Sequence, residues 1–592
     1  MPYFSTVTLR LKKSSQISIT NNPLLAGIEL GCNVFIVHQD SIINFMDRFI
    51  EFHDDATYRN PDKTVIMLMD GMQSNEKNLL AELCEHSNLV EIMNLLILKP
   101  TANMESIDLL THRFVGTIEE SVELILLDVF DVDNKTFRYG QVLFPDKISN
   151  MLGKSVRLAT VNFPPLVILR KSESGNPLVR AGNQIYEMSG NDGLLVVEFC
   201  RRYNCTVELI IDDANMWGTI EKNKTGNGIL GNLAKRRADV GIGGMNQWYK
   251  QLEFLSFSKP TQRGSVTCLV PRPGLQPAWK VMLIAFSIPV WCSTVAVLFI
   301  ILFMHHLMDQ LNPSDPDQQS FIRICLNLWA ILLQQTAYIR RRNVSDVILS
   351  MALLMFTFNL INIYSSRNAS LSTVPLFGPS IDTIYDLAKS GFTLLQTHEA
   401  WVFSLRMSEN PTIKKLVSKF QAQPPAVLRE LADKGYVALI IGRMNNGHLM
   451  LGDWITRENV HSYQLIKDDL YYDYEISMAT KTWPLMEQFN TLTIRTTEAL
   501  IGYYQELNAI YESSDYHVQT TAINSRLRES NATGALNLSG MFGVFAILGL
   551  GLFAATIIFI MEITPVQSKS GIHWHIGKKI YLWQSSCGGL EK

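Results

Sequence analysis

The chain has 592 residues, with 52 basic and 55 acidic side chains and a formal net charge of −3. This balance argues against a general nucleic-acid binder, because such a protein presents a basic surface to the phosphates. Charged residues make up only 18% of the chain and hydrophobic residues 47%, whereas an ordinary globular domain carries about 25% charged residues. The composition excludes a disordered scaffold and indicates that part of the protein lies in lipid.

The eight cysteines form no CxxC pair and no Cys/His cluster at zinc spacing, so neither a metal site nor a cofactor is expected. Cys200 and Cys205 are interpreted as buried thiols or near-surface bystanders. The opening residues, MPYFSTVTLRLKKSS, contain no apolar run of signal-peptide length. Either the true start lies upstream, or an internal segment directs insertion into the membrane.

Residues 1–150 alternate strand-like and helix-like segments. Residues 33–38 and 64–71 have the pattern of strands, and residues 41–52 and 75–87 have the pattern of amphipathic helices. This alternation predicts a layered α/β domain. No GxGxxG or GxxxxGK[ST] motif follows these strands, so no nucleotide site is expected.

A second α/β region is divided in the sequence by apolar segments. Its first part covers residues 151–275 and its second part residues 372–538, and neither part has the pattern of a self-sufficient domain. Two α/β lobes joined by crossing segments form a cleft, where small ligands usually bind.

Three apolar stretches can cross a bilayer, whose core needs roughly 20 helical residues. They are Val281–Met304, where Pro289 predicts a kink, Val347–Tyr364 and Met541–Met561. The predicted transmembrane helices cover residues 279–307, 345–366 and 540–562, and residues 563–592 are the predicted cytoplasmic tail.

A fourth stretch, Phe321–Thr336, has 16 residues and contains Arg323. It predicts a re-entrant loop over residues 319–338 rather than a crossing. Sequons that precede the first span and follow the third place both flanks outside the cell if they are glycosylated, which requires an even number of crossings between them. The positively charged residues Arg340–Arg342 then lie on the cytoplasmic side, as expected. The predicted glycosylation sites are Asn134, Asn204, Asn223 and Asn531.

Four motifs resemble those of ionotropic glutamate receptors. They are GNGILGNLAKRRADVGIGG (226–244), EFLSFSKP (253–260), LWAILLQQT (328–336) and YSSRNASLSTV (364–374). Together with the order of membrane segments, they make the chain resemble in particular the divergent insect ionotropic receptors, over about residues 150–565. The resemblance implies a two-lobed α/β extracellular domain like that of periplasmic binding proteins, interrupted by a helical pore domain with three spans and a re-entrant loop.

The same resemblance locates a ligand site and shows departures in it. Gln251 stands where the family has an arginine that holds the ligand carboxylate, and an amide cannot replace that charge-assisted pair. Leu194 replaces a stacking tyrosine, and Ile441 replaces the acid that meets an amino group. Free N–H groups at a helix start in the second lobe are expected to attract an anion or a polar atom. The full set of predicted ligand-binding residues is Phe163, Leu194, Gly244, Asn246, Gln251, Gln396 and Thr397.

The pore loop is predicted to present a ring of amide oxygens from Gln334, Gln335 and Thr336, without an acid that would select calcium. The structural alternative is that these polar residues cap the end of a helix. Polar groups in the third segment are predicted to line the gate, with helix–helix hydrogen bonding as the alternative. The predicted gate residues are Asn359, Asn362, Tyr364, Ser365 and Ala369.

We therefore predict a chemosensory or environmental-sensing cation-channel subunit that is not gated by glutamate. It would act in a hetero-tetramer with co-receptor subunits, in the cell membrane of a sensory neuron dendrite, and respond to a small molecule or a physical stimulus. The alternatives are a non-conducting ligand-binding or auxiliary subunit, and a temperature- or humidity-sensing subunit with a vestigial cleft. An enzyme is not expected, because His38 and His53 belong to no nucleophile–base–orienter pattern.

Overall fold

The computed structural model describes residues 23–59, 62–71, 76–101, 103–172, 178–274, 276–277, 279–311, 320–337, 344–373, 377–526 and 538–563. The predictions for Asn531, for Arg340–Arg342 and for the tail beyond Ile563 lie outside these residues. The chain divides into two compact units. The sheet unit comprises Met1–Arg272 and Ser380–Arg528, and the helical unit comprises Pro273–Pro379 and Glu529–Lys592.

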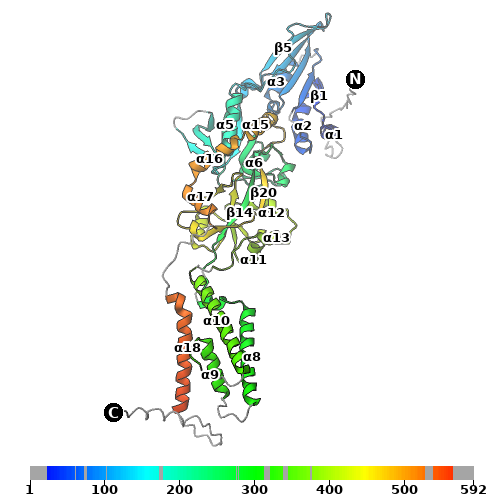
Figure 1. Ribbon diagram of the computed structural model, residues 1–592. Helices are drawn as coiled ribbons and strands as arrows, with labels where there is room; N and C mark the ends of the chain where they lie inside the picture. The colour runs from blue at the N-terminus through cyan, green and yellow to red at the C-terminus, as the bar shows by residue number, and fades with distance from the viewer. Residues whose placement is uncertain are drawn as a thin grey trace, which may run out of the picture. The chain divides into compact units, whose positions relative to one another are not determined.

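The N-terminal domain is a mixed sheet in the order β1-β2-β3-β4-β5-β6, with β1, β2 and β3 parallel and the later strands antiparallel (Figure 1). Its core forms because Phe35 of β1 points into the apolar stripe of α2, where its ring meets that of Phe49 edge-on at 5.0 Å. The bounds are α1 (Pro23–Glu29), β1 (Val34–His38), η2 (Gln39–Ser41), α2 (Ile42–Asp55), β2 (Thr64–Leu68), α3 (Glu76–Glu85), η3 (Ser87–Glu91), β3 (Asn94–Pro100), β4 (Ser106–His112), α4 (Ile118–Ser121), β5 (Leu124–Asp131) and β6 (Thr136–Phe137).

The two lobes share one sheet, in the order β16-β15-β17-β14-β20-β12-β7-β11-β9-β10-β8. The first lobe contains β7 (Ser155–Thr160), β8 (Ile168–Lys171), β9 (Val179–Ala181), β10 (Gln184–Ser189), α5 (Asn191–Tyr203), β11 (Thr206–Ile211), α6 (Gly228–Ala234), β12 (Val240–Asn246), η4 (Tyr249–Glu253) and β13 (Leu255–Phe257). The second lobe contains α11 (Ile384–Lys389), β15 (Leu394–Gln396), η5 (Glu399–Val402), α12 (Phe403–Arg406), α13 (Pro411–Val417), β16 (Phe420–Ala422), α14 (Pro425–Lys434), β17 (Ala438–Arg443), β18 (Leu449–Met450), η6 (Val460–Ser462) and β19 (Tyr463–Leu465).

Two adjacent strands, β14 (Gln262–Pro271) and β20 (Tyr471–Thr480), connect the lobes. They pair with each other, while β14 continues along β17 and β19 of the second lobe and β20 continues along β12 and β13 of the first. The chain thus returns to the first lobe after β20 with α15 (Met486–Glu498) and α16 (Ile501–Ser513). The next helix, α17 (Tyr516–Ile523), packs against η6 and β19 of the second lobe.

The boundary predicted for the second lobe, residues 372–538, therefore differs from the structure. Trp483 and Phe489 belong to the apolar core of the first lobe, where their rings lie 6.3 and 5.6 Å from Phe199. Sequence order placed this segment with the second lobe, but its large apolar side chains are buried against α5.

The chain crosses between the sheet unit and the helical unit at three places. Side-chain contacts connect the described residues next to these crossings to the second lobe. Arg272 donates to the carbonyls of Tyr463 and Ser525, both at 2.9 Å. Arg526 pairs with Asp382 at 2.8 Å. The described residues next to these three crossings, Arg272, Asp382 and Arg526, are therefore held on the second lobe.

The helical unit contains α7 (Trp279–Ile284), α8 (Ile288–Leu311), α9 (Phe321–Leu332), α10 (Val344–Thr373) and α18 (Leu538–Ile563). The predicted helix over residues 279–307 is wrong as a single element, because it breaks between α7 and α8. Pro289 does not kink this span; it lies in the first turn of α8, where its missing N–H costs no hydrogen bond.

Three of the described helices are long and apolar enough to span a membrane, over Ile288–Met308, Val347–Leu371 and Phe542–Met561. Between the first two lies α9, with 12 residues. At 1.5 Å per residue it is about 18 Å long, shorter than the roughly 30 Å hydrocarbon core. It contacts α8 and α10 (Figure 1).

Candidate functional site

Aromatic rings from both lobes meet at the cleft. Phe163, in the turn between β7 and β8, lies 5.1 Å from Trp217 of the same lobe and 6.2 Å from Trp401 of the second lobe. Trp217 in turn lies 5.7 Å from His398 and 6.1 Å from Trp401. The lobes therefore contact each other through apolar ring surfaces in this structure.

A second apolar contact lies beside these rings. Leu166 of the first lobe and Ile510 of α16 form one buried cluster with Met444 and Met450 of the second lobe, and Phe163 packs against it. Methionine side chains adapt to the shape of their partners, so this patch can rearrange when the lobes separate.

Gly244 connects the rings to a buried acid. Its backbone lies at φ +68°, and a Cβ placed there would meet Phe163 at 3.2 Å and Leu166 at 2.7 Å. Its N–H donates to Asp192 at 3.0 Å. A glycine is required here because any side chain would collide with the aromatic wall and adopt a strained backbone.

Three buried carboxyls lie near one another at the base of the cleft. Burial raises the pKa of Asp192, of Glu475 on β20 and of Glu506 on α16, and the neighbouring Asp192 carboxyl raises that of Glu475 further. Glu506 accepts from Asn446 at 2.7 Å and contacts His448 at 2.8 Å, both from the second lobe. The partners of the other two acids are amides: the Gly244 N–H donates to Asp192, and the Gln262 side chain donates to Glu475 at 2.5 Å. The buried polar groups near the contact between the lobes therefore include three carboxyls.

The predicted ligand residues do not all converge. Asn246, opposite Glu475 in the sheet, makes a side-chain hydrogen bond with Tyr471. Gln251 is buried in η4, and its Oε1 has no hydrogen-bond partner among the described residues. Leu194 is half-buried on α5. The structure thus brings Phe163 and Gly244 together, and Asp192 of α5, two residues before Leu194, bonds to the Gly244 N–H.

Two of the backbone N–H groups at the predicted helix start, those of Thr397 and Ala400, have side-chain partners. The Thr397 N–H donates to the Gln396 side chain at 2.6 Å, and the Gln396 amide donates to the Ile440 carbonyl at 2.8 Å. His398 caps the following turn by accepting from the Ala400 N–H at 3.0 Å. Local side chains therefore occupy the positions that an anion would need.

The predicted pore residues follow α9 directly. Gln334, Gln335 and Thr336 are exposed in the single chain. Gln334 has a left-handed backbone with φ +56°, and the Gln335 N–H bonds to the Ala330 carbonyl at 2.8 Å. The chain thus turns away from the helix axis at the position where these side chains begin.

The predicted gate residues lie on α10. Asn359, Asn362, Ser365 and Ala369 are exposed in the single chain, and Tyr364 is half-buried. The Tyr364 ring lies 5.5 Å from Phe286 and 6.1 Å from Trp291. Tyr364 therefore packs against the start of the first membrane helix, and a pore-lining role for the exposed residues stays a prediction.

The predicted glycosylation sites Asn134, Asn204 and Asn223 are exposed. Next to Asn204, Cys200 and Cys205 form a disulfide, so the interpretation of both as thiols is wrong. Asn204 ends α5 in a left-handed conformation and returns Cys205 to the preceding turn.

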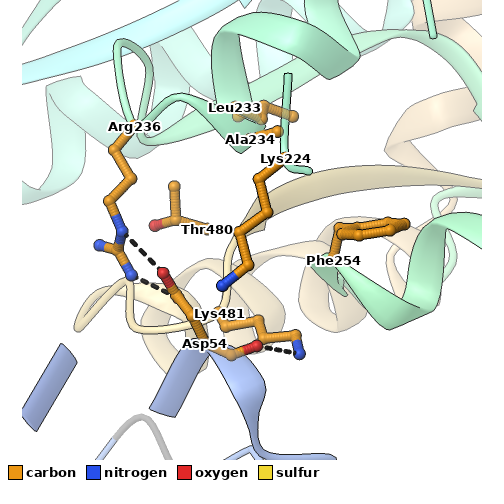
Figure 2. A pocket seen from close by; sticks show the side chains of 8 residues that line it. All are labelled: Asp54, Lys224, Leu233, Ala234, Arg236, Phe254, Thr480 and Lys481. Atoms are coloured by element: carbon orange, nitrogen blue, oxygen red, sulfur yellow. Dashed lines mark hydrogen bonds and ion pairs between the residues drawn. The ribbon is translucent and has the colours of Figure 1, made fainter. Parts of the chain in front are cut away.

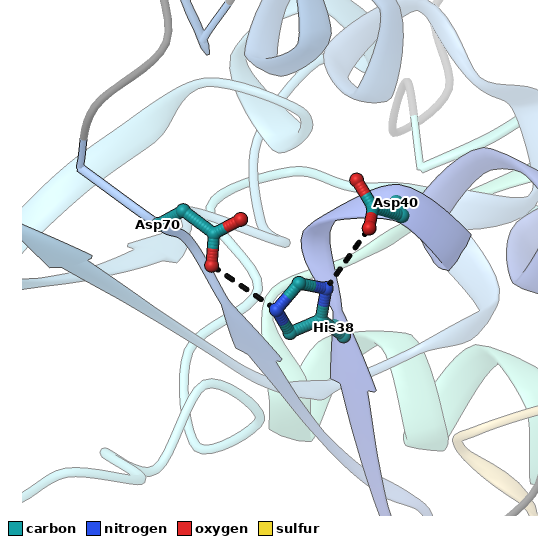
Figure 3. Close-up of side chains that lie close together, drawn as sticks. All are labelled: His38, Asp40 and Asp70. Carbon is teal, nitrogen blue, oxygen red and sulfur yellow. Dashed lines mark ion pairs between the residues drawn. The ribbon is translucent and has the colours of Figure 1, made fainter.

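One group of possible metal ligands lies at the carboxyl ends of β1 and β2 (Figure 3). His38 Nε2 faces Asp70 at 3.0 Å, and His38 Nδ1 faces Asp40 at 3.6 Å. The two ring nitrogens point in different directions, so one ion cannot take both contacts. His38 and Asp40 are exposed and Asp70 is partly exposed. The arrangement is a surface histidine with one aspartate near each of its two ring nitrogens.

Residues 287–552 match the family model described as "Ligand-gated ion channel". The chain is 25% identical over 263 residues to human glutamate receptor ionotropic, kainate 4, covering 42% of this chain and 27% of that receptor. It is 22% identical over 246 residues to human glutamate receptor ionotropic, delta-2 (41% and 24%), and 24% identical over 271 residues to a glutamate receptor of Lymnaea stagnalis (43% and 29%).

The chain is ionotropic glutamate receptor-like. The matched region spans about a quarter of the length of these relatives. It includes the membrane helices and most of the second lobe, whose order the resemblance predicted.

Sequence reasoning missed the acids and rings that build the cleft of this receptor-like chain. Glu475 lies in a strand whose following residues are all buried, and a charge inside such a run is the signal that could have drawn attention to it. Trp217 and Trp401 carried no comparable signal, because isolated tryptophans are ordinary core residues.

Proposed function

We propose that this chain is a subunit of a ligand-gated cation channel that acts in a tetramer. The observation that carries this proposal is one sheet whose two connecting strands, β14 and β20, join the lobes. The sequence of the lobes is interrupted by two long apolar helices, α8 and α10, with the short α9 between them, and a third apolar helix, α18, follows. The match of residues 287–552 to ligand-gated ion channels supports the same function. In this proposal α9 enters and leaves the membrane on one side, and Gln334, Gln335 and Thr336 line the narrow part of the pore.

The stimulus in this proposal is not glutamate. The position predicted to hold a carboxylate is Gln251, and the cleft offers aromatic rings and buried acids instead of a guanidinium. Burial in this site already raises the pKa of three carboxyls, so a further negative charge placed among them is disfavoured. Closure of the lobes on another stimulus would act on the helical unit, provided that the stimulus favours the closed state.

The proposed setting is chemosensory or environmental sensing in a sensory neuron dendrite, together with co-receptor subunits of the insect ionotropic receptor branch. The sensory alternative is a temperature- or humidity-sensing subunit, and the ring contacts that already fill part of the cleft favour it. The molecular alternative is a non-conducting auxiliary subunit.

The test is current recording from cells that express the chain with and without candidate co-receptors. Gln334→Arg should abolish or rectify cation current, because it places a positive charge at the proposed constriction. Arg323→Lys, which keeps the charge on the same short helix, is the control. Unchanged permeation in Gln334→Arg would refute the pore assignment, and Gln251→Ala then separates a chemical stimulus, which it should weaken, from a physical one.

A further inference from the structure

The junction between the N-terminal domain and the first lobe contains a network of charged side chains. Arg236, just after α6, forms two hydrogen bonds with Asp54 at 3.1 and 2.5 Å and one with Glu91 at 3.2 Å. It also donates to the Thr482 hydroxyl at 2.9 Å, and that hydroxyl donates to Glu91 at 2.9 Å. Buried Lys63 donates to the Thr482 carbonyl at 3.3 Å.

A small cavity lies inside this junction (Figure 2). The volume open to the centre of a water-sized sphere is about 10 Å³, which is room for about one such particle. Its apolar wall comes from α6 and from Phe254, which directly follows η4. Most of the polar side chains that line it are cationic. The lining residues are Asp54, Lys224, Leu233, Ala234, Arg236, Phe254, Thr480 and Lys481.

The cations of this cavity are not neutralised equally. Both carboxylate oxygens of Asp54 bond to Arg236, and Lys224 pairs with Asp55 at 2.9 Å. The ammonium of Lys481 donates only to the backbone carbonyls of Asp54 and Ala56, at 2.5 and 3.0 Å. Among the described residues no carboxylate lies within ion-pair distance of it, although its side chain is nearly buried.

The wider junction also has an excess of positive charge. Five cations, Arg59, Lys63, Lys224, Arg236 and Lys481, act on one another and on four carboxylates, Glu29, Asp54, Asp55 and Glu91. Burial lowers the pKa of Lys63 and of Lys481 to about 8, and repulsion from Arg59 and Lys224 contributes at Lys481. One monovalent anion would balance this count.

We propose that the cavity binds a single small monovalent anion such as chloride or bromide, held between the ammonium groups of Lys224 and Lys481, whose flexible side chains move apart because the ion is larger than a water molecule. Each ammonium has three donors, and the protein contacts described above use one on Lys224 and two on Lys481, which leaves donors for the ion. A phosphate or a carboxylate is too large for the space. The bound anion would reduce the repulsion between the two lysines and stabilise the docked N-terminal domain. This site is independent of the proposed cleft and pore.

The test uses the full chain in detergent at pH 7 and constant ionic strength, with thermal unfolding followed in sodium chloride, sodium bromide or sodium gluconate. We expect a saturable increase in Tm with chloride and bromide, and none with gluconate, whose anion cannot fit. Lys224→Met should weaken the apparent anion affinity at least tenfold. Lys434→Met is the matched control, because Lys434 also pairs with one carboxylate but lies on an exposed helix face.

Bromide-anomalous diffraction gives a second readout that needs no variant, with a peak expected between the two lysines. If Lys224→Met does not fold, Lys224→Arg keeps the charge opposite Asp55 and fills the cavity, and it should remove the anion dependence. A wild-type Tm that does not distinguish chloride from gluconate, an equal anion effect in Lys224→Met and Lys434→Met, or a cavity without bromide would overturn the proposal and assign a water molecule to the space.

Discussion

The first lobe has two joints of opposite chemistry. It meets the N-terminal domain through directed charged contacts centred on Arg236, Asp54 and Thr482. It meets the second lobe through the rings of Phe163, Trp217 and Trp401 and through methionines, with the contacts of Glu506 to Asn446 and His448 beside them. A planar guanidinium bonded to fixed oxygens tolerates little displacement, whereas apolar surfaces lose contact gradually. The difference predicts that a displacement is easier at the contact between the two lobes than at the charged joint with the N-terminal domain.

The largest expected effect comes from breaking the charged joint at Arg236. Arg236→Met leaves Asp54 and Glu91 without their cation in a partly buried site, and we expect a loss of about 3–5 kcal/mol in unfolding free energy. Denaturant unfolding and limited proteolysis of the N-terminal domain measure it. Arg201→Met removes an exposed pair with Glu198 and should cost less than about 1 kcal/mol. Equal losses would mean that Arg236 does not hold the joint.

The cleft side should lose stability as pH rises. Burial raises the pKa of Glu475 to about 8, so between pH 5 and 8 the unfolded chain binds fewer protons than the folded one and the unfolding free energy falls. We expect a decrease of about 3 kcal/mol across this window. Thermal unfolding of wild type and Glu475→Gln measures it, and the variant should show a weaker pH dependence. A wild-type stability that is flat from pH 6.5 to 8 would contradict the prediction.

The N-terminal domain should respond to pH with the opposite sign. Burial, with Lys147 and Lys154 nearby, holds the pKa of His112 well below its usual value of 6.5, and neither ring nitrogen has a hydrogen-bond partner among the described residues. The unfolded chain therefore binds more protons below pH 6.5, and stability falls by about 2 kcal/mol on acidification from pH 7 to 5. Hydrogen exchange of β4 measures this effect. His112→Leu should remove it, and a dependence that persists would place its origin elsewhere in the domain.

The smallest expected effect is on the ring contacts of the cleft. Phe163→Leu keeps an apolar side chain but removes edge-to-face contacts with Trp217 and Trp401, which are worth about 1 kcal/mol. We expect faster hydrogen exchange in the turn around Val167 and unchanged exchange in α2. Phe130→Leu removes a similar contact with Phe137 inside the N-terminal sheet and should leave the cleft unaffected. The reverse pattern would show that these rings do not hold the lobes together.

Local patterns predicted much of the fold. Alternating and helical periodicities located β1, α2, β2 and α3, and apolar length located the three candidate spans. They could not predict the charged joint, because Arg236 lies 182 residues from Asp54 and 246 residues from Thr482. The sequence around Asp54 and around Thr482 carries no local signal for a contact with Arg236.

The candidate site was predicted less completely than the fold. Alignment to a family motif gives a position for Gln251 but not its surroundings, so its buried, unpartnered Oε1 was not expected. The occupied N–H of Thr397 depends on how the Gln396 side chain folds back, which periodicity does not encode. Which side chains converge on the cleft is decided by the turns between strands.

The contacts of Arg272 and Arg526 hold the residues next to all three crossings between the sheet unit and the helical unit. Since the contacts of these arginines tie all three connections to the second lobe, the first lobe has no covalent connection of its own to α8, α10 or α18. Within the sheet unit, the three crossings therefore cannot be displaced independently of one another without first breaking these arginine contacts.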